Sequence, residues 1–280
     1  MGNYAHAEVL VTTNWVADHM GDSTVRIVEV DVDSTMYKEG HIEGAVGLDW
    51  ANQLCDQTLR DILTKSDFEK LCAEAGISKD TIVVFYGDNN NWFACYALWQ
   101  FKVYGHVDAR IMDGGRAKWE AEDRPLVTDV PSYPNTKYIA LDADNSIRAF
   151  KDDIFPTMES SSINLVDVRS PDEFTGKIIA PPGMNETAQR GGRIPGAANI
   201  PWGQACNEDS TFKSRDDLEK LYGEKGVTSD KPTVAYCRIG ERSSHTWFVI
   251  KYLLGHNDVK NYDGSWTEWG NLVATPIEKG

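Results

Sequence analysis

The sequence predicts an α/β protein built as two copies of one fold, each a mainly parallel sheet flanked by helices. Short β-branched runs alternate with apolar helical patterns through the first half, and such alternation is typical of parallel α/β sheets. Landmark residues of that half then return in the second half at a nearly constant spacing. The chain has 280 residues, which is enough for two domains of ordinary size.

The elements of the first copy can be placed from periodicity and capping signals. One helix illustrates the reasoning: Ser66 stands three residues before Glu69, the spacing of a capping box, and apolar residues follow at helical spacing. In chain order we expect strands over 9–11, 25–31, 81–86 and 109–112, and helices over 13–20, 66–76 and 92–104.

The character of the sequence changes after this copy. Residues 122–138 hold three prolines among Ser, Thr and Asn residues without apolar periodicity, which is typical of an extended linker. We therefore predict an N-terminal domain over 1–124, a linker over 125–144 and a C-terminal domain over 145–280.

The repeat follows from residue numbers alone. One set of six residues recurs 150 positions later, and a second set of four recurs 152 positions later. The first set is Tyr86, Gly105, His106, Asp113, Gly114 and Trp119, and the second is Ile42, Gly44, Ala45 and Trp50. Asp31, within a Val-Asp-Val triplet, matches Asp167 at a difference of 136, so we expect about sixteen extra residues near 175–190, as a surface loop.

The two copies differ most at a loop around Cys237. A β-branched run ends at this cysteine, and Arg238, Gly240 and Arg242 follow before an apolar helical pattern begins. Loop N–H groups, the first turn of a helix and two arginines all lower the pKa of a thiol held among them. We therefore expect Cys237 to be a thiolate near neutral pH that attacks an electrophilic atom in an anionic substrate. The carboxylate of Glu241 opposes this trend, and the sequence leaves its direction open.

The first copy lacks this chemistry. A shift of 150 residues aligns Cys237 with Gly87 and Arg242 with Trp92. The scaffold is kept while the thiol and the cations are lost, so we predict that the first copy is catalytically silent and has a structural role.

Composition excludes several classes of protein. The formal net charge of −15 disfavours binding to nucleic acid or to anionic membranes, because the overall field repels phosphate. Five widely spaced cysteines without a C-x-x-C pair disfavour a disulfide framework and a zinc site, and they fit a reducing compartment. The sequence shows no targeting segment and no membrane span. We expect a cytoplasmic monomer that needs neither metal nor cofactor.

Four motifs invite comparison with known families. They are Asp167-Val168-Arg169, the run 192–197, the loop at Cys237 and the run 263–269. Together they resemble the two-domain rhodaneses, which are thiosulfate sulfurtransferases, and most of all the actinobacterial type. The resemblance implies tandem rhodanese domains with an active second one.

The resemblance also implies a ping-pong reaction. In it Cys237 takes the outer sulfur of thiosulfate, releases sulfite and passes the persulfide sulfur to cyanide or to a thiol acceptor. The substrate-binding residues that the resemblance implies are Arg169, Arg238, Ile239, Gly240, Glu241, Arg242 and Ser243.

Two positions depart from the rhodanese pattern. Ile239 stands where animal rhodaneses have Lys, and Glu173 stands where the family has a substrate-binding arginine. Arg169 lies close to that position in sequence but has a second interpretation, as a scaffold salt bridge.

Three alternative functions remain open at this stage. A 3-mercaptopyruvate sulfurtransferase would use a first-domain histidine to which His41 corresponds, but Arg238 and Ile239 fit that family badly. His41 can equally be a plain turn residue. A cysteine-dependent phosphatase or arsenate reductase requires five residues between Cys and Arg, whereas Cys237 and Arg242 have four between them. A persulfide relay or binding module would turn over free thiosulfate poorly.

Overall fold

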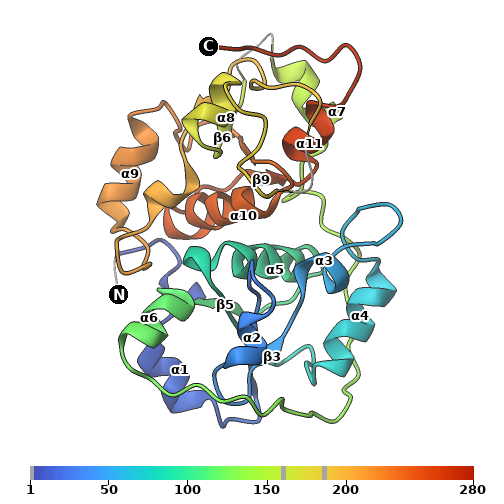
Figure 1. The fold of residues 1–280 in the computed structure, drawn as a ribbon, viewed down its shortest axis with the longest axis vertical. Coiled ribbons are helices and arrows are strands. Elements are labelled where there is room, and N and C mark those ends of the chain that lie inside the picture. Colours follow the sequence, from blue (N-terminus) through green and yellow to red (C-terminus); the bar gives the residue numbers. More distant parts are fainter. Residues whose placement is uncertain (1–2, 159–161, 185–187) are drawn as a thin grey trace. The chain divides into compact units, whose positions relative to one another are not determined.

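The computed structural model describes residues 3–158, 162–184 and 188–280 (Figure 1). Residues 185–187, which belong to the loop predicted at 175–190, lie outside the described residues. The chain forms two compact units. The N-terminal unit comprises Glu8–Asp144 and Cys206–Phe212, and the C-terminal unit comprises Met1–Ala7, Asn145–Ala205 and Lys213–Gly280. No helix in the described part of the chain is long and apolar enough to span a membrane.

A parallel sheet of five strands forms the centre of the N-terminal unit, in the order β1-β5-β4-β2-β3. The strands are β1 (Leu10–Val11), β2 (Val25–Glu29), β3 (Val46–Gly47), β4 (Ile82–Tyr86) and β5 (Ala109–Met112). The helices are α1 (Thr13–His19), α2 (Met36–Glu39), α3 (Trp50–Gln53), α4 (Lys65–Glu74), α5 (Trp92–Val103) and α6 (Gly115–Ala121), with 3-10 turns η1 (Ala7–Val9) and η2 (Asn89–Asn91). Every residue of β2 is buried, as expected for a parallel strand covered on both faces.

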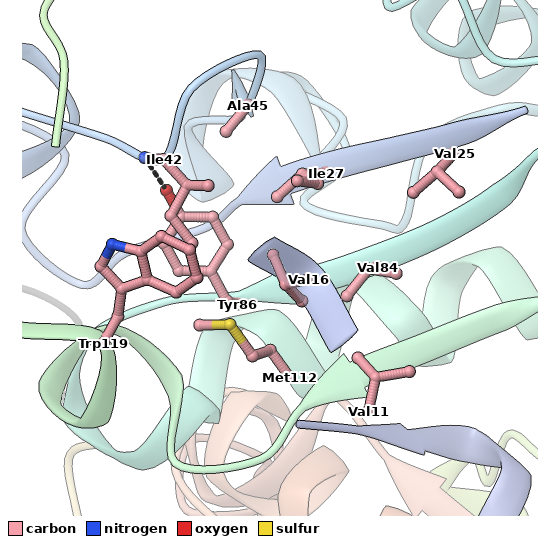
Figure 2. Packing of buried hydrophobic residues seen from close by; sticks show 10 residues of the cluster. All are labelled: Val11, Val16, Val25, Ile27, Ile42, Ala45, Val84, Tyr86, Met112 and Trp119. Carbon is pink, nitrogen blue, oxygen red and sulfur yellow. Dashed lines mark hydrogen bonds between the residues drawn. The ribbon is translucent and has the colours of Figure 1, made fainter. Parts of the chain in front are cut away.

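Side chains from four strands and two helices meet in the core of this unit (Figure 2). The buried members are Val11, Val16, Val25, Ile27, Ile42, Ala45, Val84, Tyr86, Met112 and Trp119. The Tyr86 hydroxyl accepts a hydrogen bond from the Ile42 N–H at 3.0 Å, drawn as a dashed line in Figure 2. The polar atom of this ring is thus satisfied inside an apolar cluster.

Helix α4 begins earlier than its capping signal predicts. Its N-cap is Thr64, whose hydroxyl oxygen accepts a hydrogen bond from the Asp67 N–H at 3.2 Å. Ser66 therefore lies inside the first turn, and the predicted capping box of Ser66 with Glu69 is wrong. The Glu69 carboxylate accepts instead from the Ala140 N–H at 2.9 Å, so it does not fold back onto the start of its own helix.

The C-terminal unit repeats this design with a parallel sheet of four strands in the order β7-β6-β8-β9. The strands are β6 (Asn164–Asp167), β7 (Ala198–Asn199), β8 (Thr233–Tyr236) and β9 (Val259–Tyr262). The helices are α7 (Lys151–Ile154), α8 (Pro171–Thr175), α9 (Arg215–Gly223), α10 (Glu241–Phe248) and α11 (Ser265–Trp269), with short turns η3 (Phe155–Thr157), η4 (Trp202–Ala205) and η5 (Val249–Leu253). A single bridge between Arg148 and Asn261 stands where the first copy has β1. The predicted fold class, two α/β copies with parallel sheets, is confirmed.

The repeated landmarks make the same contacts in both copies. The Ile42 N–H donates to the Tyr86 hydroxyl at 3.0 Å, and the Ile194 N–H donates to the Tyr236 hydroxyl at 3.1 Å. Each tyrosine ends an interior strand of its sheet, β4 in the first unit and β8 in the second. The same bond at the same place in each sheet agrees with the repeat inferred from residue numbers.

The predicted match of Asp31 with Asp167 is wrong by two residues. In the sheets Glu29 pairs with Tyr86 and Asp167 pairs with Tyr236, so Asp167 corresponds to Glu29, which lies 138 residues earlier. Side chains along a strand alternate between two faces, so a shift of two residues leaves the alternation unchanged. The sequence pattern therefore cannot detect such a shift. Because the next landmarks differ by 152, the second copy gains fourteen residues and not sixteen.

The segment 125–144, predicted as a linker, is bound along the N-terminal unit. The Tyr133 hydroxyl donates to the Gly44 carbonyl at 2.7 Å. The Arg26 guanidinium lies 3.2 Å from the centre of the Tyr133 ring, a cation–π contact. These contacts make the segment part of the N-terminal unit, which contains all of it.

Asp31, two residues after β2, is a buried carboxyl group. Asp31 is 6% exposed, and its Oδ1 accepts a hydrogen bond from the Asp88 N–H at 2.8 Å. Burial, and after it the neighbouring charge of Glu29, raises the pKa of Asp31 to about 8. The folded protein therefore keeps a proton at Asp31 at pH values where the unfolded chain, with a pKa of 3.8, has released it.

We predict that this proton makes the N-terminal unit less stable as the pH rises. A group whose pKa is raised by folding stabilises fully below its unfolded pKa, and its contribution is lost as pH rises from about 4 towards about 8. Asp31→Asn keeps the acceptor for Asp88 and removes the titration. Its midpoint of thermal unfolding should therefore fall less than that of the wild type between pH about 5 and about 8. The exposed Asp80→Asn is the control, and an equal pH dependence in Asp31→Asn would contradict the assignment.

Candidate active site

The loop after β8 folds back over the sulfur of Cys237. β8 ends at Tyr236, and α10 begins at Glu241. The Cys237 N–H donates to the Ser265 hydroxyl at 3.0 Å, and the Gly240 N–H donates to Cys237 Sγ at 3.2 Å. Cys237 has no exposed surface. A negative charge on this sulfur therefore meets a fixed backbone donor.

Gly240 is required by this turn. Its φ of +94° lies in the left-handed region, and a Cβ atom built on it would approach Asp263 Cα to 2.5 Å. Conformation and space both exclude a side chain at this position. The Gly240 carbonyl also accepts a hydrogen bond from the Asn261 side-chain amide at 3.0 Å, which fastens the loop to β9.

Ser243, in the first turn of α10, links the sulfur to the same strand. Its hydroxyl lies 3.6 Å from Cys237 Sγ and 2.6 Å from Asn261 Oδ1. Asn261 is fully buried, and both ends of its amide are hydrogen-bonded. The structure therefore brings Ser243 against the thiol and fixes its orientation from β9.

The carboxylate of Glu241, whose direction the sequence left open, points at the sulfur. Glu241 Oε2 lies 3.2 Å from Cys237 Sγ. Its other oxygen, Oε1, lies 3.7 Å from Arg238 Nη2 and 4.0 Å from Arg242 Nε. The side chain has no exposed surface. One carboxylate thus stands between the thiol and two arginines.

This carboxylate overturns the expected thiolate. Burial first, and then the charge of Glu241, raises the pKa of Cys237, while Arg242 and the Ser243 hydroxyl lower it by less. The 3.2 Å contact of Cys237 Sγ with a carboxylate oxygen also has the geometry of a thiol that donates a hydrogen bond, so the predicted neutral-pH thiolate is not supported. The sequence showed the two cations, but it did not show the depth of burial or the direction of Glu241.

The two residues that follow the cysteine are buried as well. Arg238 is 5% exposed and approaches Glu241, while its carbonyl accepts a hydrogen bond from the Thr267 N–H at 2.9 Å. Ile239 is 1% exposed. It brings no charge to the position where animal rhodaneses have Lys, so the cations of the loop are Arg238 and Arg242.

Arg242 is held by the residue that replaces the family arginine. Its Nη1 and Nη2 donate to the two carboxylate oxygens of Glu173, each at 3.1 Å. Glu173 also accepts a hydrogen bond from the Ser170 N–H at 3.0 Å and so closes the capping box at the start of α8. The position that carries an arginine in the family thus carries the negative charge of Glu173 here, and the positive charge of Arg242 pairs with it.

Arg169 is bound within the scaffold. Its Nε donates to Asp167 Oδ1 at 2.9 Å, and its Nη2 donates to the Gly192 carbonyl at 2.7 Å. The first copy builds the same device from Glu29, the equivalent of Asp167, which forms a buried ion pair with Arg116. The predicted substrate contact of Arg169 is not supported, because its guanidinium is occupied by the scaffold salt bridge.

His41 is likewise occupied. Its Nδ1 lies 2.8 Å from the Tyr37 carbonyl oxygen and its Nε2 lies 3.2 Å from the Asp129 carbonyl oxygen. The ring is fully buried and stacks on the Tyr37 ring with centres 3.9 Å apart. This is the turn histidine of the second interpretation, and its ring nitrogens face backbone of its own unit.

The first copy has filled the space that a thiol would need. Asn91 Oδ1 accepts the Gly87 N–H at 3.0 Å, and its Nδ2 donates to the Met112 carbonyl at 2.8 Å. A Cβ atom on Gly87 would overlap the Val30 carbonyl oxygen. A cysteine at position 87 would therefore fit only if the residues that follow β2 moved.

Two site residues escaped the sequence analysis, although the repeat carried a signal for them. Ser265 binds the Cys237 N–H, and Asn261 holds the loop. At a shift of 150 they stand where the first copy has Gly115 and Ile111. Ser265 adopts a φ of +49°, which is rare for a residue with a side chain and recurs at functional sites. Positions 261 and 265 are thus buried and polar in the second copy but apolar or small in the first. This difference between the copies is the sequence signal for the residues that support the Cys237 loop.

Comparisons with known proteins agree on one family. The family model described as "Rhodanese-like domain" matches residues 12–122 and 156–272. A Haloferax volcanii protein named "Putative thiosulfate sulfurtransferase" is 53% identical over 286 residues and covers 100% of both chains. "Sulfur carrier protein TtuD" of Thermus thermophilus is 54% identical over 281 residues and covers 99% of both chains. The crystal structure of SseA from Escherichia coli, described among 3-mercaptopyruvate sulfotransferases, has a TM-score of 0.81 and 25% identity and covers 92% of this chain and 98% of that one.

We predict that Glu173→Gln destabilises the C-terminal unit. The change leaves Arg242 buried without its counter-charge, and removing one partner of a buried ion pair costs about 3 kcal/mol. The free energy of unfolding from a denaturant titration measures the loss. The neighbouring Asp172→Asn is the control, because Asp172 is half exposed and pairs with Lys177 at the surface. A Glu173→Gln variant as stable as Asp172→Asn would show that the pair does not hold the loop.

A second prediction concerns the filled loop of the first copy. Gly87→Ala forces a methyl group against the Val30 carbonyl and should lower the free energy of unfolding by about 1–3 kcal/mol. Gly21→Ala in the same unit is a matched control, because a Cβ there meets nothing within 4 Å. Equal stability of the two variants would mean that the first loop has room for a side chain after all.

Proposed function

Because the chain belongs to the rhodanese-like domain family, we propose that it is a thiosulfate sulfurtransferase that works through Cys237. The observation that carries the proposal is a buried thiol with a backbone N–H 3.2 Å from its sulfur and two arginines on the same loop. The full-length relative from Haloferax volcanii, at 53% identity, supports the same reaction. The protein is an enzyme that moves sulfur from a donor to an acceptor.

In the first half-reaction the Cys237 sulfur, as a thiolate, attacks the outer sulfur of thiosulfate. A sulfur–sulfur bond forms at Cys237, the sulfur–sulfur bond of thiosulfate breaks, and its electron pair leaves with sulfite. The Gly240 N–H, 3.2 Å from Sγ, stabilises negative charge at this sulfur. No strong acid is needed, because sulfite is a stable leaving group.

In the second half-reaction an acceptor attacks the outer sulfur of the persulfide. Cyanide becomes thiocyanate, and a thiol becomes a persulfide, while Cys237 departs with the electron pair of the broken bond. The enzyme returns to its starting state, so the two substrates bind in turn.

The donor's sulfonate group is assigned to Arg238 and Arg242. Guanidinium forks bind sulfonate oxygens through charge-assisted hydrogen bonds. Both arginines lie within 4.0 Å of Glu241 Oε1, and Glu173 binds both terminal nitrogens of Arg242, so an anionic donor competes with two carboxylates for these cations. The competition predicts a donor site that is weaker than two free arginines would give.

The two copies divide the work. We assign catalysis to residues 145–280 and a silent, structural role to residues 1–124, joined through 125–144, because the loop at Gly87 is filled. The five cysteines are all unpaired and buried, which supports a reducing, cytoplasmic setting. A monomer working without metal or cofactor fits this scheme. Within the described ranges no group of three or more His, Cys, Asp or Glu side chains is arranged to hold a metal ion.

Two alternatives have an observation in their favour. The structural likeness to SseA favours 3-mercaptopyruvate as donor, whereas the enclosed ring of His41 disfavours it. The relative named as a sulfur carrier favours a relay of persulfide between proteins. A phosphatase or arsenate reductase remains disfavoured by the spacing of Cys237 and Arg242, which have four residues between them where that chemistry requires five.

We predict that Cys237→Ala lowers the rate of thiocyanate formation from thiosulfate and cyanide at least about a thousand-fold, because the change removes the proposed nucleophile. Cys55→Ala, a change at another buried cysteine, should retain activity. The colorimetric thiocyanate assay, run in parallel with 3-mercaptopyruvate, measures both. Faster turnover of 3-mercaptopyruvate would reverse the choice of donor, and turnover in Cys237→Ala would overturn the proposed function.

A further inference from the structure

Glu241 is buried beside the sulfur with an incomplete set of hydrogen bonds. It is the first residue of α10, yet no side chain caps this helix. Within the described residues its Oε1 has no hydrogen-bond partner, although the side chain has no exposed surface. Burying a carboxylate with an incomplete set of hydrogen bonds costs stability. A residue kept at such a cost, in contact with the reacting atom, points to a role in the reaction.

The proposed reaction leaves a proton unassigned. The 3.2 Å contact between Cys237 Sγ and Glu241 Oε2 has the geometry of a thiol that donates to a carboxylate, and such a thiol must lose its proton before it attacks. A thiol acceptor also arrives with a proton, which must leave as its sulfur becomes the nucleophile. The leaving Cys237 sulfur must then be protonated to restore the resting state. Each of these transfers takes place at or next to Sγ.

The other charged groups around this site are occupied. Across from α10, Glu173 of α8 is bound to Arg242. Asp263, which follows β9, is bound to Arg148 at 3.2 Å. Arg238 and Arg242 remain cations and cannot accept a proton.

The histidine in α10 is also unsuited to accept the proton. His245 is fully buried in α10, with its ring edge-on to Trp202, and burial lowers its pKa to about 3. The carboxylate that contacts the sulfur is that of Glu241, at 3.2 Å, within the reach required of a general base.

We propose that Glu241 is the proton carrier of both half-reactions and the general base for thiol acceptors, an assignment that rests on the proposed sulfurtransferase function. During loading, Oε2 takes the proton of the Cys237 thiol and returns it to the transferred sulfur, so that thiol and thiosulfate become protonated persulfide and sulfite. Charge and atoms balance: no external proton is needed.

During discharge the same oxygen serves the acceptor. The acceptor thiol gives its proton to Glu241, and its sulfur forms a bond to the outer sulfur of the persulfide. The bond between that outer sulfur and Cys237 breaks, and its electron pair stays on Cys237. Glu241 then protonates this sulfur, which leaves a Cys237 thiol and an acceptor persulfide. Arg238 and Arg242, at 3.7 Å and 4.0 Å from Oε1, place two positive charges beside this carboxylate throughout the cycle.

Cyanide supplied above its own pKa makes no such demand. Hydroxide removes the proton of the loaded persulfide at this pH, and the anionic persulfide and a cyanide anion then give a Cys237 thiolate and thiocyanate with no proton passing through Glu241. A comparison of a thiol with cyanide as acceptor therefore distinguishes proton transfer by Glu241 from its other roles. If Glu241 only shaped the loop or changed the charge at Cys237, its substitution would change the discharge rate by a similar factor with both acceptors.

The test compares Glu241→Gln with the wild type in single-turnover discharge of a preformed persulfide. Inorganic polysulfide loads Cys237, so the outcome does not depend on thiosulfate as donor, and mass spectrometry confirms loading before each run. With a thiol acceptor at neutral pH, Glu241→Gln should be slower by about a hundred-fold, the usual contribution of a general base. With cyanide at alkaline pH the variant should lose less than about three-fold.

Acceptor thiols of different acidity give a second readout. With Glu241 in place, the discharge rate should depend weakly on the pKa of the acceptor. In Glu241→Gln the rate should follow the thiolate fraction of the acceptor, so that acidic thiols or higher pH rescue it. Glu241→Asp keeps a carboxylate on a shorter arm and should recover part of the thiol rate.

Equal losses with thiol and cyanide, or no dependence on acceptor pKa in Glu241→Gln, would overturn the proposal. Thermal unfolding of both variants guards against a folding defect, and Glu241→Asp supplies the comparison if Glu241→Gln does not fold. Failure of thiosulfate to load the wild type would instead reject the proposed function, while leaving the role of Glu241 measurable with polysulfide.

Discussion

A carboxylate buried against a thiol is the constraint on which the C-terminal unit depends. Glu241 Oε2 lies 3.2 Å from Cys237 Sγ, and neither side chain has exposed surface. A charge buried so deeply requires opposite charge beside it, and Arg238 and Arg242 provide it from the same loop. Arg242 in turn is held by Glu173, so the five-residue helix α8 is tied to the loop. Each charge near the sulfur is thus anchored by the next, out to the scaffold.

The same scaffold carries one loop with a cysteine and one loop without it. A tyrosine at the end of an interior strand binds a backbone N–H in each copy, Tyr86 in one and Tyr236 in the other. The difference begins one residue later. In the second copy Cys237 receives an N–H from Gly240, whereas in the first an asparagine amide fills the loop and Gly87 has no room for a side chain. The fold fixes where a loop lies, and the loop residues decide whether it can hold a nucleophile.

Local signals predicted the fold and the Cys237 loop because strand–helix alternation and residue spacing depend on neighbours in sequence. The protonation of Cys237 could not be predicted, since it depends on burial and on the direction of Glu241, which no local pattern encodes. Glu173 follows Ser170 at the spacing of a capping box, so its place at a helix start was visible in the sequence. Its pairing with Arg242 joins residues 69 positions apart and follows only from tertiary packing.

The proposal that Cys237 carries the transferred sulfur can be tested directly. The purified protein is mixed with thiosulfate in the absence of an acceptor, digested and analysed by mass spectrometry, while released sulfite is assayed in the same sample. We expect one additional sulfur atom on the peptide that contains Cys237, and one sulfite released per chain. Sulfur appearing on Cys206 or another cysteine, or sulfite released without sulfur on Cys237, would contradict the account.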